Sequence, residues 1–379
     1  MPASRPPDTP ADIEARLVDG RCWEAFCEAL KQAGQQVLRD GTPATPFDRA
    51  EGWRYLTRLT RIGLEMFVEG GSPQYPSFMV PSHETAKIGA DNPDMAYMAA
   101  RIDGHLRYRV WGERGSIASI NFATKRGGYD QGGQLLPSGF LDSHALQVEA
   151  DGTFELTLSP TPVLGNWLKT DPADVQLLVR QVYRDRRHER PAKLQIECLD
   201  TAGTAPPPLS PTAFADQLQR TGQFVGHTAR LFADWAEGFE AHTNRLVAQD
   251  QAPFQRAGGD PNIHYLHSYW RLAPDEALLF ELDRVPPCEH WNLQVNNHWM
   301  ESLDYRYHQV CLNDHSARRC PDGGLRLVLS HEDPGTPNWL QTAGHDRGTL
   351  LWRWIGAQDP VVPRTRLVKL SQITPVGTR

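Results

Sequence analysis

The sequence predicts a β-dominated α+β protein, in which two tandem jelly-roll or sandwich-like β domains follow an N-terminal helical segment and flank a helical connector. Three observations support this. Hydrophobic residues recur with a period of two in two separate stretches, a helical period precedes each stretch, and an internal repeat links the two. A chain of 379 residues, 40% of them hydrophobic, is long enough for two or three domains with cores of their own.

The composition restricts the classes of partner. A net charge of −7 argues against a nucleic-acid binder that depends on a basic surface, and no apolar run approaches the roughly 18 residues needed to cross a membrane. The first eight residues hold no apolar stretch after a basic segment, and the six scattered cysteines form no CxxC pair. We therefore expect a cytoplasmic protein with a small-molecule ligand, without nucleic-acid or membrane partners, and of unknown oligomeric state.

Residues 1–95 are expected to form a helical N-terminal region. Hydrophobic residues follow a helical spacing over residues 11–40, and a second helix is predicted over residues 48–69. Gly41 ends the first of these helices. Residues 70–95 are rich in Gly, Pro, Ser and Asn, so we expect them to form a long ordered loop.

The two stretches with strand periodicity define the β domains, residues 96–200 and 260–372. Short alternating runs separated by turns favour antiparallel sheets over a parallel sheet with helical crossovers. Residues 201–211 form a proline-rich linker, and residues 212–250 are expected to be a helical connector, as one long helix or two short ones. Its hydrophobic stripe, expected to pack against a β domain, consists of Phe214, Leu218, Val225, Phe232, Trp235 and Phe239.

An internal repeat predicts two copies of one β domain. Three segments of the first domain are echoed in the second, in register to within two residues. Each copy holds an Asp-Gly turn before an alternating strand, an Asn-Trp-Leu turn, and a nearly continuous apolar strand. We expect the copies to superpose, with Trp167 and Trp339 in equivalent positions. The matched pairs are 151–159 with 322–330, 166–168 with 338–340, and 177–180 with 350–353.

The second copy resembles a known family. Residues 322–340 read Asp-Gly-Gly-Leu-Arg-Leu-Val-Leu-Ser-His-Glu-Asp-Pro-Gly-Thr-Pro-Asn-Trp-Leu, and Val285-Pro-Pro287 and Trp291-Asn-Leu293 precede them. This pattern is similar to the bacterial domain-of-unknown-function family 1214, and its Asp-Gly…Asn-Trp-Leu part is present twice in this chain. The resemblance covers roughly residues 50–372. It implies β-rich, jelly-roll-like domains with helical additions, and it implies no reaction.

Several catalytic motifs are absent from the sequence. The chain has no G-x-x-x-x-G-K-[ST], no G-x-G-x-x-G that opens a helix after a strand, no G-x-S-x-G and no H-E-x-x-H. The sequence therefore does not favour a P-loop NTPase, a Rossmann dehydrogenase, an α/β-hydrolase or a zincin.

A polar row in the second β domain is the candidate site. In the predicted strand over residues 290–296, alternate side chains would face a core, and the opposite face carries only amides and an imidazole. Such groups need partners if they are buried, and they suit the lining of a polar pocket; an ordinary solvent-facing strand is the alternative. The core-facing residues are Trp291, Leu293 and Val295, and the polar row is His290, Asn292, Gln294 and Asn296.

The segment that follows adds three candidates. If residues 305–312 pair back on this strand as a hairpin, Arg306 and His308 share one face and Tyr307 lies on the other. Because histidine titrates near neutrality, His290 and His308 are the candidate catalytic bases. The histidine spacing matches no familiar ligand set, so no metal is expected, and the cofactor is left unknown. The ligand-binding candidates are Asn292, Gln294, Asn296, Arg306 and Tyr307.

These patterns leave three hypotheses about function. The first is an enzyme that acts on a small organic molecule, aromatic or steroid-like, in a polar and aromatic pocket of the second β domain. The second is a non-catalytic protein that binds a carbohydrate or a lipid-like ligand. The third is a partner-binding protein that uses the connector helix. A closed pocket with a histidine bonded to a carboxylate would favour catalysis.

Overall fold

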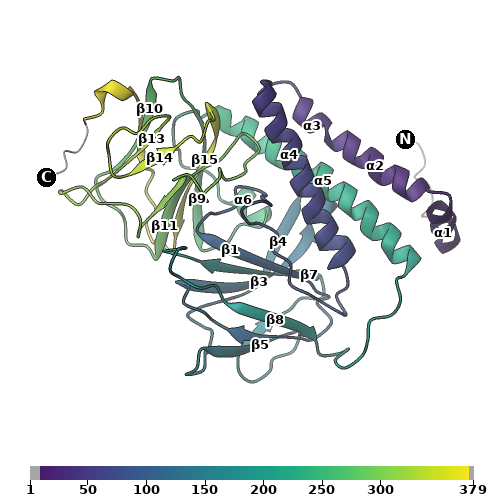
Figure 1. Ribbon diagram of the computed structural model, residues 1–379. Helices are drawn as coiled ribbons and strands as arrows, with labels where there is room; N and C mark the ends of the chain where they lie inside the picture. Colours follow the sequence, from purple (N-terminus) through teal and green to yellow (C-terminus); the bar gives the residue numbers. More distant parts are fainter. Residues whose placement is uncertain (1–8, 375–379) are drawn as a thin grey trace.

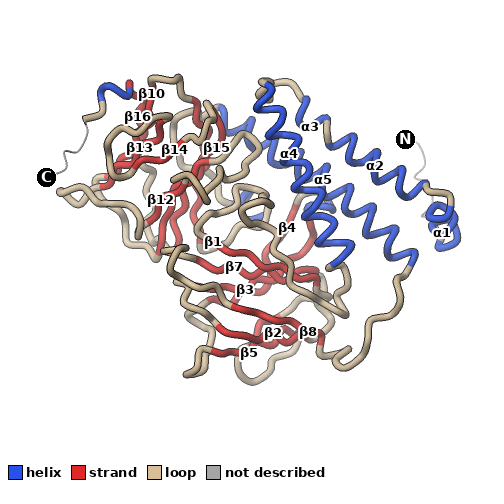
Figure 2. Tube along the Cα trace, in the orientation of Figure 1, coloured by secondary structure: helices blue, strands red, loops and turns tan. Residues whose placement is uncertain are grey.

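The computed structural model describes residues 9–374, so that Met1–Asp8 of the expected N-terminal region and residues 375–379 lie outside the described part. Figure 1 shows two bodies of strands beside a layer of helices, and Figure 2 shows that the long helices gather on one side of the molecule. The predicted class, a β-dominated α+β protein with two tandem β domains, is confirmed.

The described part of the N-terminal region contains four α-helices where the sequence predicted two. The first predicted helix is interrupted at Gly20, whose left-handed φ of 85° does not continue a helix. The second begins at Thr45, which forms a capping box with Asp48, and it ends in the π-helical segment η1 (Leu64–Glu69). The α-helices are α1 (Pro10–Val18), α2 (Arg21–Ala33), α3 (Gln35–Leu38) and α4 (Pro46–Gly63).

The first β domain consists of two four-stranded sheets, with strand orders β1-β7-β3-β4 and β6-β5-β2-β8. All neighbouring strands are antiparallel except β5 and β6. The short 3-10 helix η2 (Tyr129–Gln131) follows β3. The strands are β1 (Met95–Arg101), β2 (Tyr108–Glu113), β3 (Ser119–Gly128), β4 (Gln134–Asp142), β5 (Thr153–Ser159), β6 (Trp167–Lys169), β7 (Asp174–Val182) and β8 (Lys193–Cys198).

The second β domain repeats this topology. Its sheets have the orders β9-β15-β11-β12 and β14-β13-β10-β16, and its single parallel pair, β13 with β14, matches β5 with β6. The 3-10 turn η3 (Leu370–Gln372) follows its last strand. The strands are β9 (Ile263–Arg271), β10 (Glu276–Leu282), β11 (His290–Val295), β12 (Cys311–Asn313), β13 (Leu325–Ser330), β14 (Trp339–Gln341), β15 (Arg347–Ile355) and β16 (Arg364–Lys369).

The repeated tryptophans occupy equivalent positions. Trp167 begins β6 and Trp339 begins β14. In each copy the indole Nε1 donates to the carbonyl of the serine that ends the neighbouring strand, Ser159 or Ser330, at 3.2 Å. The asparagine before each tryptophan donates to a backbone carbonyl of the same neighbouring strand at 2.9 Å. The Asn-Trp-Leu segments therefore tie adjacent strands together.

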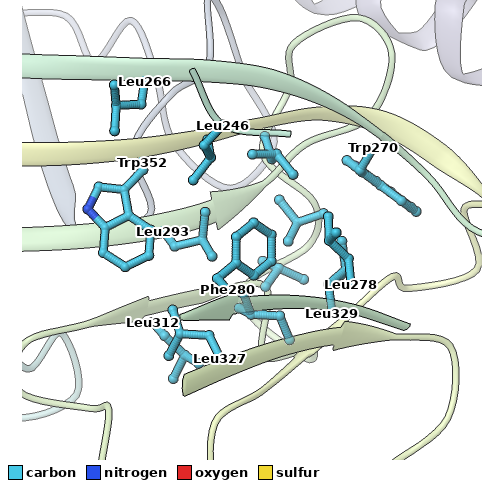
Figure 3. Close-up of a cluster of buried hydrophobic side chains, with 14 of the residues drawn as sticks. Leu246, Leu266, Trp270, Leu278, Phe280, Leu293, Leu312, Leu327, Leu329 and Trp352 are labelled. Atoms are coloured by element: carbon cyan, nitrogen blue, oxygen red, sulfur yellow. The ribbon is translucent and has the colours of Figure 1, made fainter. Parts of the chain in front are cut away.

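The core of each β domain lies between its two sheets. In the second domain, Trp352 and Leu293 of one sheet face Phe280 of the other (Figure 3). In the first domain, the rings of Phe122 and Phe154, from opposite sheets, meet edge to face at 5.8 Å. Each such buried side chain contributes about 1.5–3 kcal/mol of transfer free energy, so both sheets of each domain are held together by burial.

The helical connector is one long helix, α5 (Pro211–Glu240), and the short helix α6 (Ala252–Arg256) follows it. Helix α5 contacts α2 and α4 as well as β9 and β15 of the second domain. Within residues 9–374, no helix has the length and hydropathy that a membrane span requires. In the predicted stripe, Leu218, Val225, Phe232 and Phe239 are buried, and Phe214 and Trp235 are partly buried.

Candidate functional site

The predicted polar row is buried between the two β domains. Strand β11 alternates as predicted, with Trp291, Leu293 and Val295 in the domain core and the polar side chains on the other face. Residues Ala90–Asp94, which precede β1, cover this face and bond to its amides. The row is therefore not an exposed strand face, and Asn292 and Gln294 have partners in the segment that leads into the first domain.

The amides of the row have close partners. Asn292 Nδ2 donates to Asn92 Oδ1 at 2.6 Å. Gln294 Nε2 donates to Asp91 O at 3.0 Å and to Asn296 Oδ1 at 2.6 Å. These bonds bring Gln294 and Asn296 together and fasten the row to the segment before the first domain.

His290 lies between two carboxylates. Its Nδ1 contacts Asp314 Oδ1, and its Nε2 is 3.9 Å from Asp94 Oδ2. Burial would raise the pKa of Asp314, but the hydrogen bond and the charge of His290 lower it. A histidine–carboxylate pair is thus present, with the imidazole only 3% exposed.

The prediction that residues 305–312 pair with β11 as a hairpin is wrong. Strand β11 pairs with β15 and with β12; β12 begins only at Cys311, and residues 305–308 form a turn. Arg306 and His308 therefore share no strand face, and Tyr307 points outward with 77% of its surface exposed. The expectation failed because alternation between faces applies to a strand and not to a turn.

Arg306 and His308 line a polar pocket of about 220 Å³ between α4 and the second domain. Glu51 and His345 line it too, with Glu51 Oε2 3.3 Å from His345 Nε2. Burial would raise the pKa of Glu51, yet hydrogen bonds from His345 and Asn297 lower it to about 2. Charged groups of this pocket pair with one another and tie α4 to the second domain.

A second cavity, of about 170 Å³, lies where the two β domains meet helix α5. None of the seven predicted site residues lines it. Cavities of about 150 Å³ accept a benzene ring, so this one has room for about one ring. Most of its wall is apolar, and its aromatic side chains include Phe67, Phe224, Phe232, Trp235 and Phe254.

Two buried arginines line this cavity, one from each domain. Arg180 of β7 and Arg353 of β15 end the matched segments of the internal repeat. Each lies opposite a tyrosine on the neighbouring strand, Tyr97 for Arg180 and Tyr265 for Arg353. The arginines are 7% and 4% exposed. Since burying a charge is costly, two arginines at equivalent buried positions indicate a specific role.

The arginines make reciprocal contacts across the domain interface. Arg180 Nη2 donates to Gly258 O, which precedes the second domain, at 2.5 Å. Arg353 Nη2 donates to Ala90 O, which precedes the first domain, also at 2.5 Å. Each domain thus holds the segment that leads into the other.

Two asparagines repeat this exchange. Asn121 lies opposite Arg180 on β3, and its Nδ2 donates to Asp260 Oδ2 at 3.0 Å. Its counterpart Asn292 lies opposite Arg353 on β11 and donates to Asn92. The two domains are therefore arranged like the halves of a symmetric dimer, in which equivalent residues exchange equivalent contacts.

The electrostatics of the interface shift the pKa values of Lys125 and His267 downward. Burial and the charge of Arg180 lower the pKa of Lys125, whose Nζ lies 3.4 Å from Gly258 O, to about 7. Burial and Arg353 lower the pKa of His267 well below its usual range, which keeps this cavity-lining ring neutral at pH 7. The arginines remain the charged donors of the site.

Three cavity-lining nitrogens have no hydrogen-bond partner in the described part of the chain: Arg180 Nη1, Arg101 Nε and His267 Nδ1. Asp260 Oδ2 lies 3.8 Å from Arg180 Nη1, which is too far for a hydrogen bond. Buried polar atoms are normally paired, so these nitrogens suit a ligand with an acceptor. Over residues 9–374, no group of three or more His, Cys, Asp or Glu side chains is placed to hold a metal ion.

Two features of the sequence, beyond those that predicted the polar row, mark this cavity. The repeat ends in an arginine in both copies, and in each copy this charged residue directly follows three apolar residues. A second repeat precedes each domain: Asn92-Pro-Asp94 before Tyr97 is echoed by Asp260-Pro-Asn262 before Tyr265. A charge that recurs in a buried strand is a stronger indication of a site than an amide row on one strand.

Fold and cavity together define a class, tandem β-domain proteins with a helical layer and a ligand-sized cavity at the domain interface. The family model of DUF1214, a family of proteins of unknown function, matches residues 273–359, which lie within the second β domain. The chain is similar to an uncharacterized protein from Burkholderia cenocepacia whose crystal structure is known. The two sequences are 52% identical, their structures match with a TM-score of 0.92, and the match covers 94% of this chain and 99% of that one.

A more distant likeness is to the crystal structure of the VPA0106 protein from Vibrio parahaemolyticus. It is 13% identical, with a TM-score of 0.47, and the match covers 84% of this chain and 98% of that one. A comparison with curated proteins finds no match.

Proposed function

We propose that this protein binds a small, largely apolar molecule of about one ring in the cavity between its β domains. One observation carries the proposal: an apolar and aromatic wall surrounds about 170 Å³ and includes buried nitrogens that lack partners among residues 9–374. Small-molecule sites combine an apolar lining with a few polar groups that orient the ligand.

This geometry favours binding over the other hypotheses. The cavity suits one ring better than the fused rings of a steroid, and its apolar wall suits an apolar ligand better than a carbohydrate. His290 contacts the carboxylate of Asp314, His308 is hydrogen-bonded to Gln341, and neither of these candidate catalytic bases lines the cavity. Much of the stripe on α5 is covered by the chain itself, which removes the reason to expect a docking partner there. We therefore place the ligand at the domain interface.

Filling the cavity should weaken binding. Isothermal titration calorimetry of the full chain with benzyl alcohol, indole and benzoate should find at least one that binds. Leu178 lines the cavity, and Leu178→Phe should weaken that binding at least about tenfold because the larger ring occupies part of the space. Leu164→Phe, at a fully exposed loop position, is the control and should bind as the wild type does. The proposal is wrong if none of the three compounds binds, or if a folded Leu178→Phe binds them unchanged.

A further inference from the structure

The two buried arginines differ in one contact. In the second domain, Arg353 Nη1 donates to Gln294 Oε1. Strands β3 and β11 are equivalent, and their pairing with β7 and β15 places Ala123 where the second domain has Gln294. Alanine offers no side-chain acceptor. Arg180 Nη1 is therefore left without a hydrogen-bond partner in the described part of the chain, while its counterpart has one.

We propose that the ligand of this cavity is an organic acid, whose carboxylate accepts a hydrogen bond from Arg180 in the place that the Gln294 side chain fills beside Arg353. This inference rests on the proposed function and specifies its ligand class. Ala123 is then a specificity-determining residue, because its side chain offers Arg180 no acceptor and leaves that contact to the ligand's acid group.

The charges around the cavity favour an anion. The two carboxylates that line the cavity already have partners. Asp130 accepts from Arg220 Nε and Asp91 accepts from Ser302 Oγ, both at 2.8 Å. Asp260, which is not among the lining residues, accepts from Asn121 Nδ2 at 3.0 Å and lies 3.8 Å from Arg180 Nη1. The cavity wall thus carries more positive than negative charge, which an anionic ligand would offset. The charged lining residues are Arg101, Arg180 and Arg353, with Asp91 and Asp130.

A monocarboxylate matches the free donors better than a phosphate does. Arg180 Nη2 is already bonded to Gly258 O, so one terminal nitrogen of this guanidinium is open. A carboxylate brings two oxygens and one charge, whereas a phosphate would bury more oxygens than this end of the cavity has donors to satisfy. The aromatic wall then surrounds the rest of the molecule, so the class is a one-ring monocarboxylic acid such as benzoate.

The test compares benzoate with benzyl alcohol, which share a ring and differ in charge. Calorimetric titration of the full chain at pH 7 should give benzoate an affinity at least about tenfold higher than benzyl alcohol. Ala123→Gln would offer Arg180 the acceptor that Arg353 has, and Arg180→Gln removes the cation. Both variants should bind benzoate and benzyl alcohol with about equal affinity. Arg109→Gln, a partly exposed arginine of the sheet β6-β5-β2-β8, is the matched control and should keep it.

The outcomes separate this inference from the proposed function. If benzoate, benzyl alcohol and indole all fail to bind, the proposed function is wrong and the inference falls with it. If indole alone binds, the proposed function stands and the assignment to acids is overturned. If benzoate and benzyl alcohol bind the wild type equally, the cavity accepts one-ring molecules but the assignment to acids is overturned. A benzoate preference that survives in folded Ala123→Gln and Arg180→Gln also overturns it, because the acid then binds elsewhere. Circular dichroism checks folding. If Ala123→Gln does not fold, the benzoate preference measured for Arg180→Gln decides whether the inference holds. If neither variant folds, the comparison of benzoate with benzyl alcohol on the wild type decides it.

Discussion

At the scale of single residues, the domain interface is distinguished by lysine and arginine side chains that are buried within strands. Lys125, Arg180 and Arg353 are all less than 10% exposed, and most residues of the strands that carry them are buried. Desolvation of a cation opposes folding, so each of them lowers stability unless its partners compensate. Positions that break the local pattern in this way indicate function rather than packing. His290, in contrast, lies between the carboxylates of Asp94 and Asp314 and does not line the cavity.

Lys125→Met should stabilise the protein more at pH 7 than at pH 10. The pKa of Lys125 is about 7 in the folded chain and about 10.4 in an unfolded chain. Between these values the unfolded chain binds one more proton, so the wild type gains stability as the pH rises, and the variant lacks this dependence. In urea unfolding, the stability gain of the variant should be about 3 kcal/mol larger at pH 7 than at pH 10.

Lys193→Met provides the control for this comparison. Lys193 is exposed on β8, so its replacement should change stability by a similar small amount at both pH values. An equal gain for Lys125→Met at pH 7 and pH 10 would mean that the buried amine keeps its proton in the folded chain.

Helix α5 determines how the helical layer is packed at the scale of the element. It contacts α2 and α4 as well as two strands of the second domain. Gly222 marks its close approach to α2, because a Cβ added there would lie 2.8 Å from Ala29 Cβ. Gly226, one turn further along the same helix, has open space around the equivalent position. Substitutions at these two glycines therefore separate the cost of close packing from the gain in intrinsic helix propensity.

Gly222→Ala and Gly226→Ala should have opposite effects on the free energy of unfolding. Alanine is favoured over glycine within a helix by about 1 kcal/mol, so Gly226→Ala should be stabilising by up to that amount. At Gly222 the added methyl group meets Ala29, and overpacking of about 1–3 kcal/mol should outweigh the propensity gain. Chemical denaturation measures both. A gain at both positions would show that α2 and α5 separate easily.

Reciprocal exchange of segments joins the two β domains at the scale of the whole molecule. Residues 90–94 cover β11 of the second domain, and residues 258–260 bond to Arg180 and Asn121 of the first. Neither domain satisfies these buried polar groups by itself, since the partners come from the other half of the chain. The domains should therefore depend on each other for stability.

Calorimetry of the full chain should show one unfolding transition, with the calorimetric enthalpy equal to the van't Hoff enthalpy. Asn92→Ala removes an acceptor of Asn292 and should lower the midpoint of that single transition, at a cost of about 1–3 kcal/mol. Two well-separated transitions in the wild type would contradict this mutual dependence.

Much of the fold could be predicted from local sequence pattern. The two-residue period predicted β domains, and it predicted that Trp291, Leu293 and Val295 face a core. These features follow from side-chain alternation and turn chemistry, which involve only neighbouring residues. The break at Gly20 and the turn at residues 305–308 were missed, because element boundaries depend on a few individual backbone conformations.

The sequence by itself determined the fold class, the repeated domain and the face of β11 on which the polar row lies. Only the tertiary structure decided what covers that face and where the cavity forms. Asn292 meets Asn92, 200 residues away in the chain, and Arg180 meets Gly258 of the other half. Alternation along a strand specifies the direction of a side chain but not the segment that packs on it, because that contact depends on how distant parts of the chain approach each other.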